Sequence, residues 1–145
     1  MASSNPSEEE VRKLSVEIRY FEQTAEALQQ RLSMMNAALT DLTYANATLE
    51  NIEKKKENAE LLVPIGGSSY MNAKLVNPDK VIVGIGAGVS LEKSLPEAKT
   101  LLKERMDELE KTRNSAQQQL GQVAQRIAQS RNKIESLLAG LREGN

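Results

Sequence analysis

The chain contains 145 residues with a mass of 16.0 kDa, and it has no Cys, no His and no Trp. The usual ligands of structural zinc, haem and iron–sulfur sites are therefore missing, as are the side chains of thiol catalysis and of His-based triads. The 19 basic and 20 acidic residues give a formal net charge of −1, which provides no overall attraction to nucleic acid or to an acidic membrane. We expect a protein that is not an enzyme, needs no metal or other cofactor, and binds neither nucleic acid nor membrane.

Two further features of the composition concern the core and the compartment. Aromatic residues make up only 3% of the chain, so few side chains are available to fill a thick globular core. The residues up to Glu10 lack the basic and then apolar layout of a signal peptide, and no apolar stretch is long enough to cross a membrane. The absence of Cys also fits a reducing compartment. The sequence therefore predicts a cytoplasmic protein.

The first predicted element is a long helix over about residues 8–58. Apolar residues recur in alternating steps of three and four from Val11 to Leu49, which is the spacing of a coiled-coil seam. Ser7 and Glu10 have the spacing of a capping box at the start of this helix. No Gly or Pro interrupts the chain from there to Pro64. The apolar seam positions are Val11, Leu14, Ile18, Phe21, Ala25, Leu28, Leu32, Met35, Leu39, Leu42 and Leu49.

The middle segment, about residues 61–92, changes to the composition of β-strands. Four short runs rich in β-branched residues are separated by turn residues at 66–68, 77–80 and 86–88. Strands this short expose their edges and an apolar face, and such edges pair readily with other chains. We therefore expect this segment to be an oligomerisation surface. The residues assigned to it are Val63, Ile65, Met71, Leu75, Val81, Val83, Ile85 and Val89.

The glycines from Gly84 to Gly88 allow two interpretations. Their spacing has some similarity to a phosphate-binding loop, but that loop requires a further glycine and a helix that opens immediately after it. Here residues 89–91 continue as strand, and no Gly-Lys-Ser or Gly-Lys-Thr follows. The pattern therefore favours glycines of a turn or a β-bulge.

The last predicted element is a second long helix over about residues 95–141. Ser94 and Glu97 form a capping box, and Pro96 lies in the first turn, where a missing N–H costs nothing. The heptad spacing returns from Leu102 to Leu141, with Arg113 and Ser130 as polar exceptions in the seam.

Two apolar stripes on one chain are most simply buried against each other as an antiparallel coiled coil. The alternatives are that each helix pairs with another chain, or that both join a larger bundle. In the antiparallel arrangement both ends of the chain meet at one tip, where apolar side chains exceed what a two-stranded seam covers. This tip is a candidate contact site for other apolar surfaces, although ordinary seam packing would also account for it. The candidate residues are Val11, Leu14, Ile18, Leu137, Leu138 and Leu141.

Two long helices flanking two β-hairpins, with the run Leu-Val-Pro-Ile-Gly-Gly at 62–67 and Val-Gly-Ile-Gly-Ala-Gly at 83–88, resemble the alpha class of prefoldin subunits. The resemblance spans nearly the whole chain, so residues 1–145 are expected to form a single domain. It implies an α+β fold in which a long two-helix coiled coil carries two β-hairpins that join an intersubunit β-barrel.

The resemblance also implies partners and a function. Such subunits form a hexamer of two alpha-class and four beta-class chains, which holds unfolded or nascent proteins without ATP and passes them to a group II chaperonin. If so, the tip residues are the expected contacts for client proteins. The competing hypothesis is a structural coiled-coil adaptor that does not hold clients.

Overall fold

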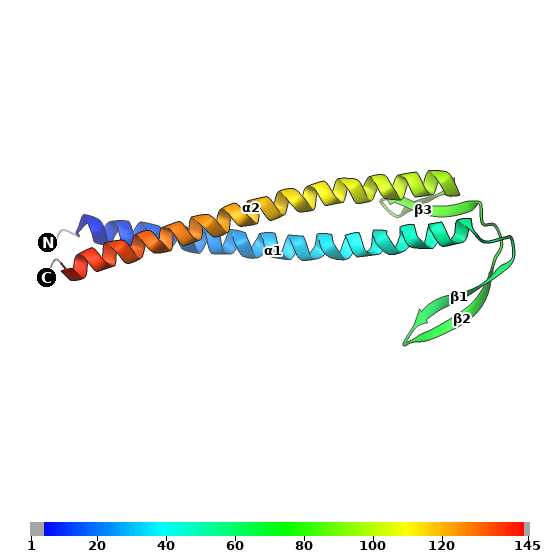
Figure 1. Ribbon diagram of the computed structural model, residues 1–145, viewed down its shortest axis with the longest axis horizontal. Helices are drawn as coiled ribbons and strands as arrows, with labels where there is room; N and C mark the ends of the chain where they lie inside the picture. Colours follow the sequence, from blue (N-terminus) through cyan, green and yellow to red (C-terminus); the bar gives the residue numbers. More distant parts are fainter. Residues whose placement is uncertain (1–4, 144–145) are drawn as a thin grey trace. The chain divides into compact units, whose positions relative to one another are not determined.

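The computed structural model describes residues 5–143, which form two long helices with two β-hairpins between them (Figure 1). Each hairpin is a separate two-stranded antiparallel sheet, one made of β1 and β2 and the other of β3 and β4. The predicted fold class is confirmed: the chain is two helices with two hairpins. In chain order the elements are α1 (Pro6–Glu53), β1 (Ala59–Gly66), β2 (Ser69–Leu75), β3 (Lys80–Gly86), β4 (Val89–Ser94) and α2 (Leu95–Glu143).

The chain divides into two compact units, each of which contains parts of both helices. The first unit consists of residues 1–37 and 111–145, and the second consists of residues 38–110. Both chain ends belong to the first unit, and both hairpins belong to the second.

Both ends of α1 differ from the sequence prediction. The side-chain oxygen of Asn5 accepts a hydrogen bond from the amide of Ser7 at 3.0 Å, so Asn5 is the N-cap and Pro6 is the first helical residue. Ser7 is therefore inside the helix and not its cap. The helix ends at Glu53 rather than near residue 58. Asn58 has a positive φ of 63° and its amide already donates to the carbonyl of Leu75 at 2.7 Å, so the chain has turned into the first hairpin by then.

In the first unit the two helices pack antiparallel. Three ion pairs join the N-terminal part of α1 to the C-terminal part of α2: Glu10 with Lys133 at 2.9 Å, Glu17 with Arg126 at 3.5 Å, and Glu22 with Arg131 at 2.6 Å. Exposed pairs of this kind contribute little stability individually. Between the first two pairs, α1 advances from Glu10 to Glu17 while α2 goes back from Lys133 to Arg126, as expected for antiparallel helices. The beginning of α1 and the end of α2 accordingly lie at the same end of the unit (Figure 1). The buried seam residues are Leu14, Leu28, Leu32, Met35, Ala116 and Ser130.

Arg113 is the least favourable residue in the seam. Its Nε atom is buried without a hydrogen-bond partner among residues 5–143, and only its Nη2 atom donates, to the Asn114 side chain at 3.5 Å. We expect Arg113→Leu to raise the free energy of unfolding by about 1 kcal/mol, because a buried unpaired donor is replaced by an apolar side chain. Urea unfolding measures the change. Gln122→Leu, at an exposed position of the same helix, is the control and should change stability much less.

In the second unit the β3–β4 hairpin packs against the helices. Val83 of β3 forms a buried cluster with Leu49 of α1 and with Leu95 and Ala98 of α2. The start of α2 is fixed at the same place, since Ser94 Oγ accepts a hydrogen bond from the Glu97 amide at 3.3 Å, as the capping box predicts. This cluster joins β3, the first turn of α2 and the end of α1.

The two hairpins have matching turns. In β1–β2 the turn residues Gly66, Gly67 and Ser68 have φ values of 102°, 58° and 59°, and in β3–β4 Gly86, Ala87 and Gly88 have 110°, 53° and 75°. The strand register shifts just before each turn, between residues 64 and 66 and between residues 84 and 86. The glycines singled out in the sequence therefore belong to a hairpin turn with an adjacent irregularity. Positive φ values explain why glycine is favoured there.

Candidate interaction surfaces

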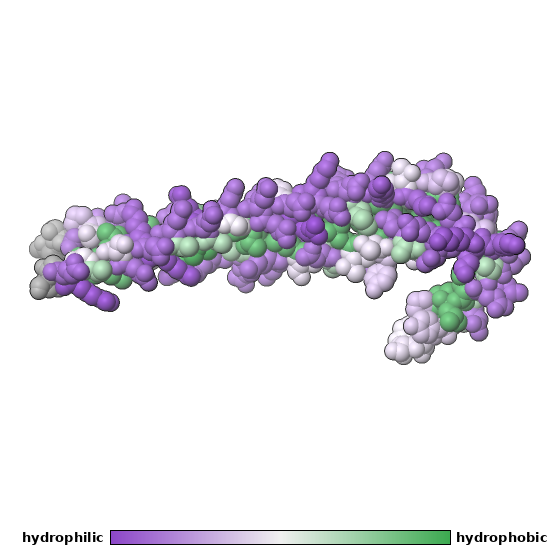
Figure 2. Space-filling view, in the orientation of Figure 1, coloured by the Kyte–Doolittle hydropathy of each residue, from purple (hydrophilic) through white to green (hydrophobic). Residues whose placement is uncertain are grey.

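The β1–β2 hairpin carries an apolar face that is exposed in the half nearest its turn. Residues that pair across the strands point to the same side, so Val63 with Met71, and Leu61 with Ala73, share one face. Val63 is 42% exposed and Met71 is 59% exposed. Figure 2 shows apolar residues gathered on this hairpin as well as along the line between the helices. An open apolar face next to unpaired strand edges is a surface for association with another chain.

The β3–β4 hairpin carries the corresponding face, but part of it is covered. Val83 is only 5% exposed because it packs on Leu95 and Ala98 of the same chain. The prediction that Val83 belongs to the oligomerisation surface is therefore corrected, since this side chain is already occupied within the subunit. Ile85 and Val89, beside the turn, are 47% and 49% exposed and remain available to a partner.

The remaining predicted assembly residues lie at the edges of these two faces. Ile65 is 59% exposed beside the first turn, whereas Leu75 and Val81 are half-buried. The structure thus brings Val63, Met71 and Leu75 onto one hairpin face and places Val81 with Val83 against the helices.

Arg105 holds the second hairpin on the helix, a role that was not predicted from the sequence. Its Nη2 atom donates a hydrogen bond to the backbone carbonyl of Gly84 at 2.5 Å. This bond joins α2 to β3 at the position where the strand register shifts. The local sequence does not distinguish Arg105 from other helix arginines. Its contact exists only because the β3–β4 hairpin folds back onto α2, which the local sequence does not report.

The predicted tip lies in the first unit, where the beginning of α1 and the end of α2 lie together. Leu138 is the most accessible of the six tip candidates at 38% exposure, and Val11, Ile18, Leu137 and Leu141 are half-buried. Leu14 is buried in the seam, so its assignment to a contact surface is corrected: a heptad core position faces the other helix. The accessible apolar surface of the tip therefore depends most on Leu138.

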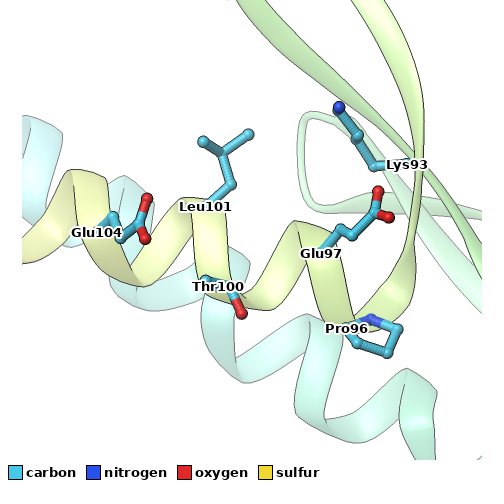
Figure 3. A pocket seen from close by; sticks show the side chains of 6 residues that line it. All are labelled: Lys93, Pro96, Glu97, Thr100, Leu101 and Glu104. Carbon is cyan, nitrogen blue, oxygen red and sulfur yellow. The ribbon is translucent and has the colours of Figure 1, made fainter.

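A shallow pocket of about 420 Å³ lies where β4 meets α2 (Figure 3). It is lined by Lys93 from the strand and by residues of the first helical turns, including Glu97, Leu101 and Glu104. Nearby, Lys99 Nζ lies 2.6 Å from a carboxylate oxygen of Glu53, and this hydrogen bond raises the pKa of Lys99 above its ordinary value. Because the lysine pKa is raised, Lys99 keeps its proton and its charge at neutral pH and loses them only in alkaline solution.

Among residues 5–143 no three Asp or Glu side chains gather in a group suited to hold a metal ion. No helix in this range combines the length and the apolar character needed to cross a membrane.

A paired-helix chain with an open, apolar β-hairpin defines a coiled-coil subunit of an oligomeric protein. Residues 21–140 match the family model described as prefoldin subunit, and the chain belongs to this family. It is 34% identical over 125 residues to prefoldin subunit alpha of Methanococcoides burtonii, with 86% of this chain and 91% of the relative covered. The resemblance to the alpha class is thereby confirmed, and the chain is a subunit of a chaperone family.

Two solved structures support the same fold. A filamentous PFD from Methanocaldococcus jannaschii, determined by cryo-EM, has a TM-score of 0.63 and 27% identity, with 84% of this chain and 95% of that chain covered. The prefoldin beta subunit from Thermococcus strain KS-1 has a TM-score of 0.59, and the match covers 94% of this chain and 96% of that subunit. Its sequence identity is 17%, so this likeness shows the fold alone.

Proposed function

We propose that the chain is the alpha-class subunit of a hexamer with two alpha-class and four beta-class subunits, and that the hexamer holds non-native proteins without ATP. It then transfers them to a group II chaperonin in the cytoplasm. The single observation that carries the proposal is the open apolar face of β1–β2, in which Val63 and Met71 are exposed on a two-stranded sheet with unpaired edges.

The assembly surface follows from the energetics of that face. Exposed apolar side chains and free strand edges are costly in water and are stabilised together when hairpins of neighbouring subunits complete a shared β-barrel. In this proposal the barrel contacts come from the available members of the predicted set. These are Val63, Ile65, Met71, Leu75, Val81, Ile85 and Val89.

The client surface is assigned to the tip of the helix pair. Val11, Ile18, Leu137, Leu138 and Leu141 supply partly exposed apolar surface at the end of the first unit. Each contact would be weak, because these side chains are half-covered by the seam. A hexamer that presents several tips to one unfolded chain gains affinity from multivalency. Neither catalysis nor a cofactor is required for holding of this kind.

The test is to mix the purified chain with a beta-class subunit of the same organism. Native mass by light scattering reports assembly, and the turbidity of chemically unfolded citrate synthase, diluted without ATP, reports holding. The proposal expects a hexamer that suppresses aggregation. A hexamer that does not suppress aggregation would favour the structural adaptor. If no hexamer forms, the proposed assembly is ruled out. Addition of a group II chaperonin with ATP then tests whether the held protein is released and refolds.

Leu138→Ser should weaken client capture while leaving the hexamer intact. Leu138 is the tip candidate with the largest exposure, so its loss removes contact surface without opening the seam. We expect the concentration for half-maximal suppression of aggregation to rise by about three-fold. Ala139→Ser, at the neighbouring exposed position, is the matched control. Loss of the hexamer in the Leu138 variant would instead show that this side chain is structural.

A further inference from the structure

The outer side of α1, away from the seam, carries a second apolar feature in the first unit. Two of the three outward-facing heptad positions between residues 16 and 34 carry only exposed, uncharged side chains, whereas the third carries Arg19, Glu26 and Ser33. Val16, Tyr20 and Met34 are 62%, 64% and 73% exposed, which makes them more accessible than any tip candidate. We call this surface the outer stripe of α1. Its members are Val16, Tyr20, Gln23, Ala27, Gln30 and Met34.

The corresponding positions of α2 in the same unit provide an internal comparison. They are also exposed and uncharged, but every one of them is polar. The contrast shows that large apolar side chains on the outer side belong to one helix only and do not result from a generally apolar surface. The α2 positions are Ser115, Gln118, Gln122, Gln125, Gln129 and Asn132.

Charged residues border the stripe. Arg19 and Glu26 are exposed on the same outer side of α1, whereas Glu17 and Glu22 flank the seam and are paired across it with Arg126 and Arg131. The stripe positions themselves are uncharged, so an apolar segment that covers only these positions leaves the neighbouring charges in water.

The spacing of the stripe excludes a second stable helix as its partner. A helix seam needs an apolar residue at every step of three or four, whereas Gln23, Ala27 and Gln30 separate Tyr20 from Met34. Three large side chains also fall well short of the roughly 800 Å² that each partner buries in a stable interface. The surface is suited to weak contacts at separate points.

Tyr20 and Met34 are about 20 Å apart along the helix, a distance that about six residues of extended chain span. Methionine adapts its shape to irregular apolar groups, and tyrosine provides a rigid apolar ring with a polar end. We infer that the outer stripe of α1 binds extended, apolar segments of non-native polypeptides along the side of the helix pair, as a contact separate from the tip. This inference rests on the proposed holding function.

The test uses the complex of the full chain with its beta-class subunit. The stripe variant Val16→Gln, Tyr20→Gln and Met34→Gln makes the outer side of α1 resemble that of α2 and retains good helix formers. The probe is fluorescently labelled, reduced and carboxymethylated α-lactalbumin, which stays unfolded. We expect its dissociation constant to rise roughly three- to ten-fold, by a similar factor at low and high salt, with native mass and melting temperature unchanged. The control variant Ser115→Gln with Asn132→Gln should bind as the wild type does.

A second measurement locates the contact. A photo-crosslinking amino acid at position 34 should capture the labelled client, whereas the same group at position 125 should not. Unchanged affinity in the stripe variant, or equal crosslinking at both positions, would overturn the inference while the proposed function stands. A change of native mass in the stripe variant would show an assembly contact and would also overturn it. A wild-type complex that captures no client at all would remove the proposed function and the stripe inference together.

Discussion

Val63→Asp should leave the chain unable to form the hexamer with beta-class subunits. Val63 is 42% exposed in the monomer and pairs with Met71 on the apolar face that the proposed barrel covers. A carboxylate on that face would have to be buried without a partner, which costs several kcal/mol, and the cost recurs in both alpha-class chains of the complex. Size-exclusion chromatography with light scattering should then show free subunits in place of a complex.

Leu62→Asp is the matched control, because it introduces the same charge one residue earlier on the same strand. Leu62 is 67% exposed and pairs with Asn72 on the opposite face of the hairpin, which the proposed barrel leaves in water. This variant should assemble. If the Leu62 variant also fails to form the hexamer, then both faces of the hairpin are buried in the complex. Normal assembly of the Val63 variant would exclude the apolar face as the interface.

Leu49→Ala should destabilise the second unit by about 2–4 kcal/mol, through the lost burial of its side chain and the cavity left behind. Leu49 is 5% exposed and forms the cluster with Val83, Leu95 and Ala98. Because the cluster holds the β3–β4 hairpin on the helices, hydrogen exchange should accelerate at the amides of β3 and β4 more than at those of β1 and β2. Urea unfolding gives the free energy, and mass spectrometry gives the exchange.

Tyr44→Ala provides the comparison for this variant. Tyr44 lies on the same helix and in the same unit but is 72% exposed, so its truncation should change stability by a few tenths of a kcal/mol at most. Equal destabilisation by the two substitutions would show that Leu49 has no special role in holding the hairpin.

Local signals explain where sequence reasoning succeeded. The heptad spacing of the two helices and the turn residues of the hairpins act over a few positions, so they can be read without knowing the fold. The cap at Ser94 was predicted in the same way, and the structure confirms it. At the other helix two capping residues competed, and Asn5 took the place expected for Ser7 because Pro6 is well suited to the first helical position.

The end of α1 shows the limit of such signals. Charged residues from Glu53 to Glu57 are good helix formers, and their pattern predicts a helix that continues to about residue 58. The helix stops at Glu53 because the first strand begins at Ala59 and the Asn58 amide is needed in the hairpin. This competition is between distant parts of the chain, and no local pattern reports its outcome.

The sequence by itself indicated the elements, the heptad seam of each helix and the family, because periodicity, turn chemistry and the two glycine-containing runs are properties of short segments. Only the tertiary structure decided which of two equivalent side chains is buried and which is exposed. Val63 and Val83 each stand two residues before an Ile-Gly pair in matching hairpins. Val83 is buried because β4 continues directly into α2, whose first turn brings Leu95 and Ala98 onto it. Val63 has no helix directly after its hairpin, so its face stays open for another subunit.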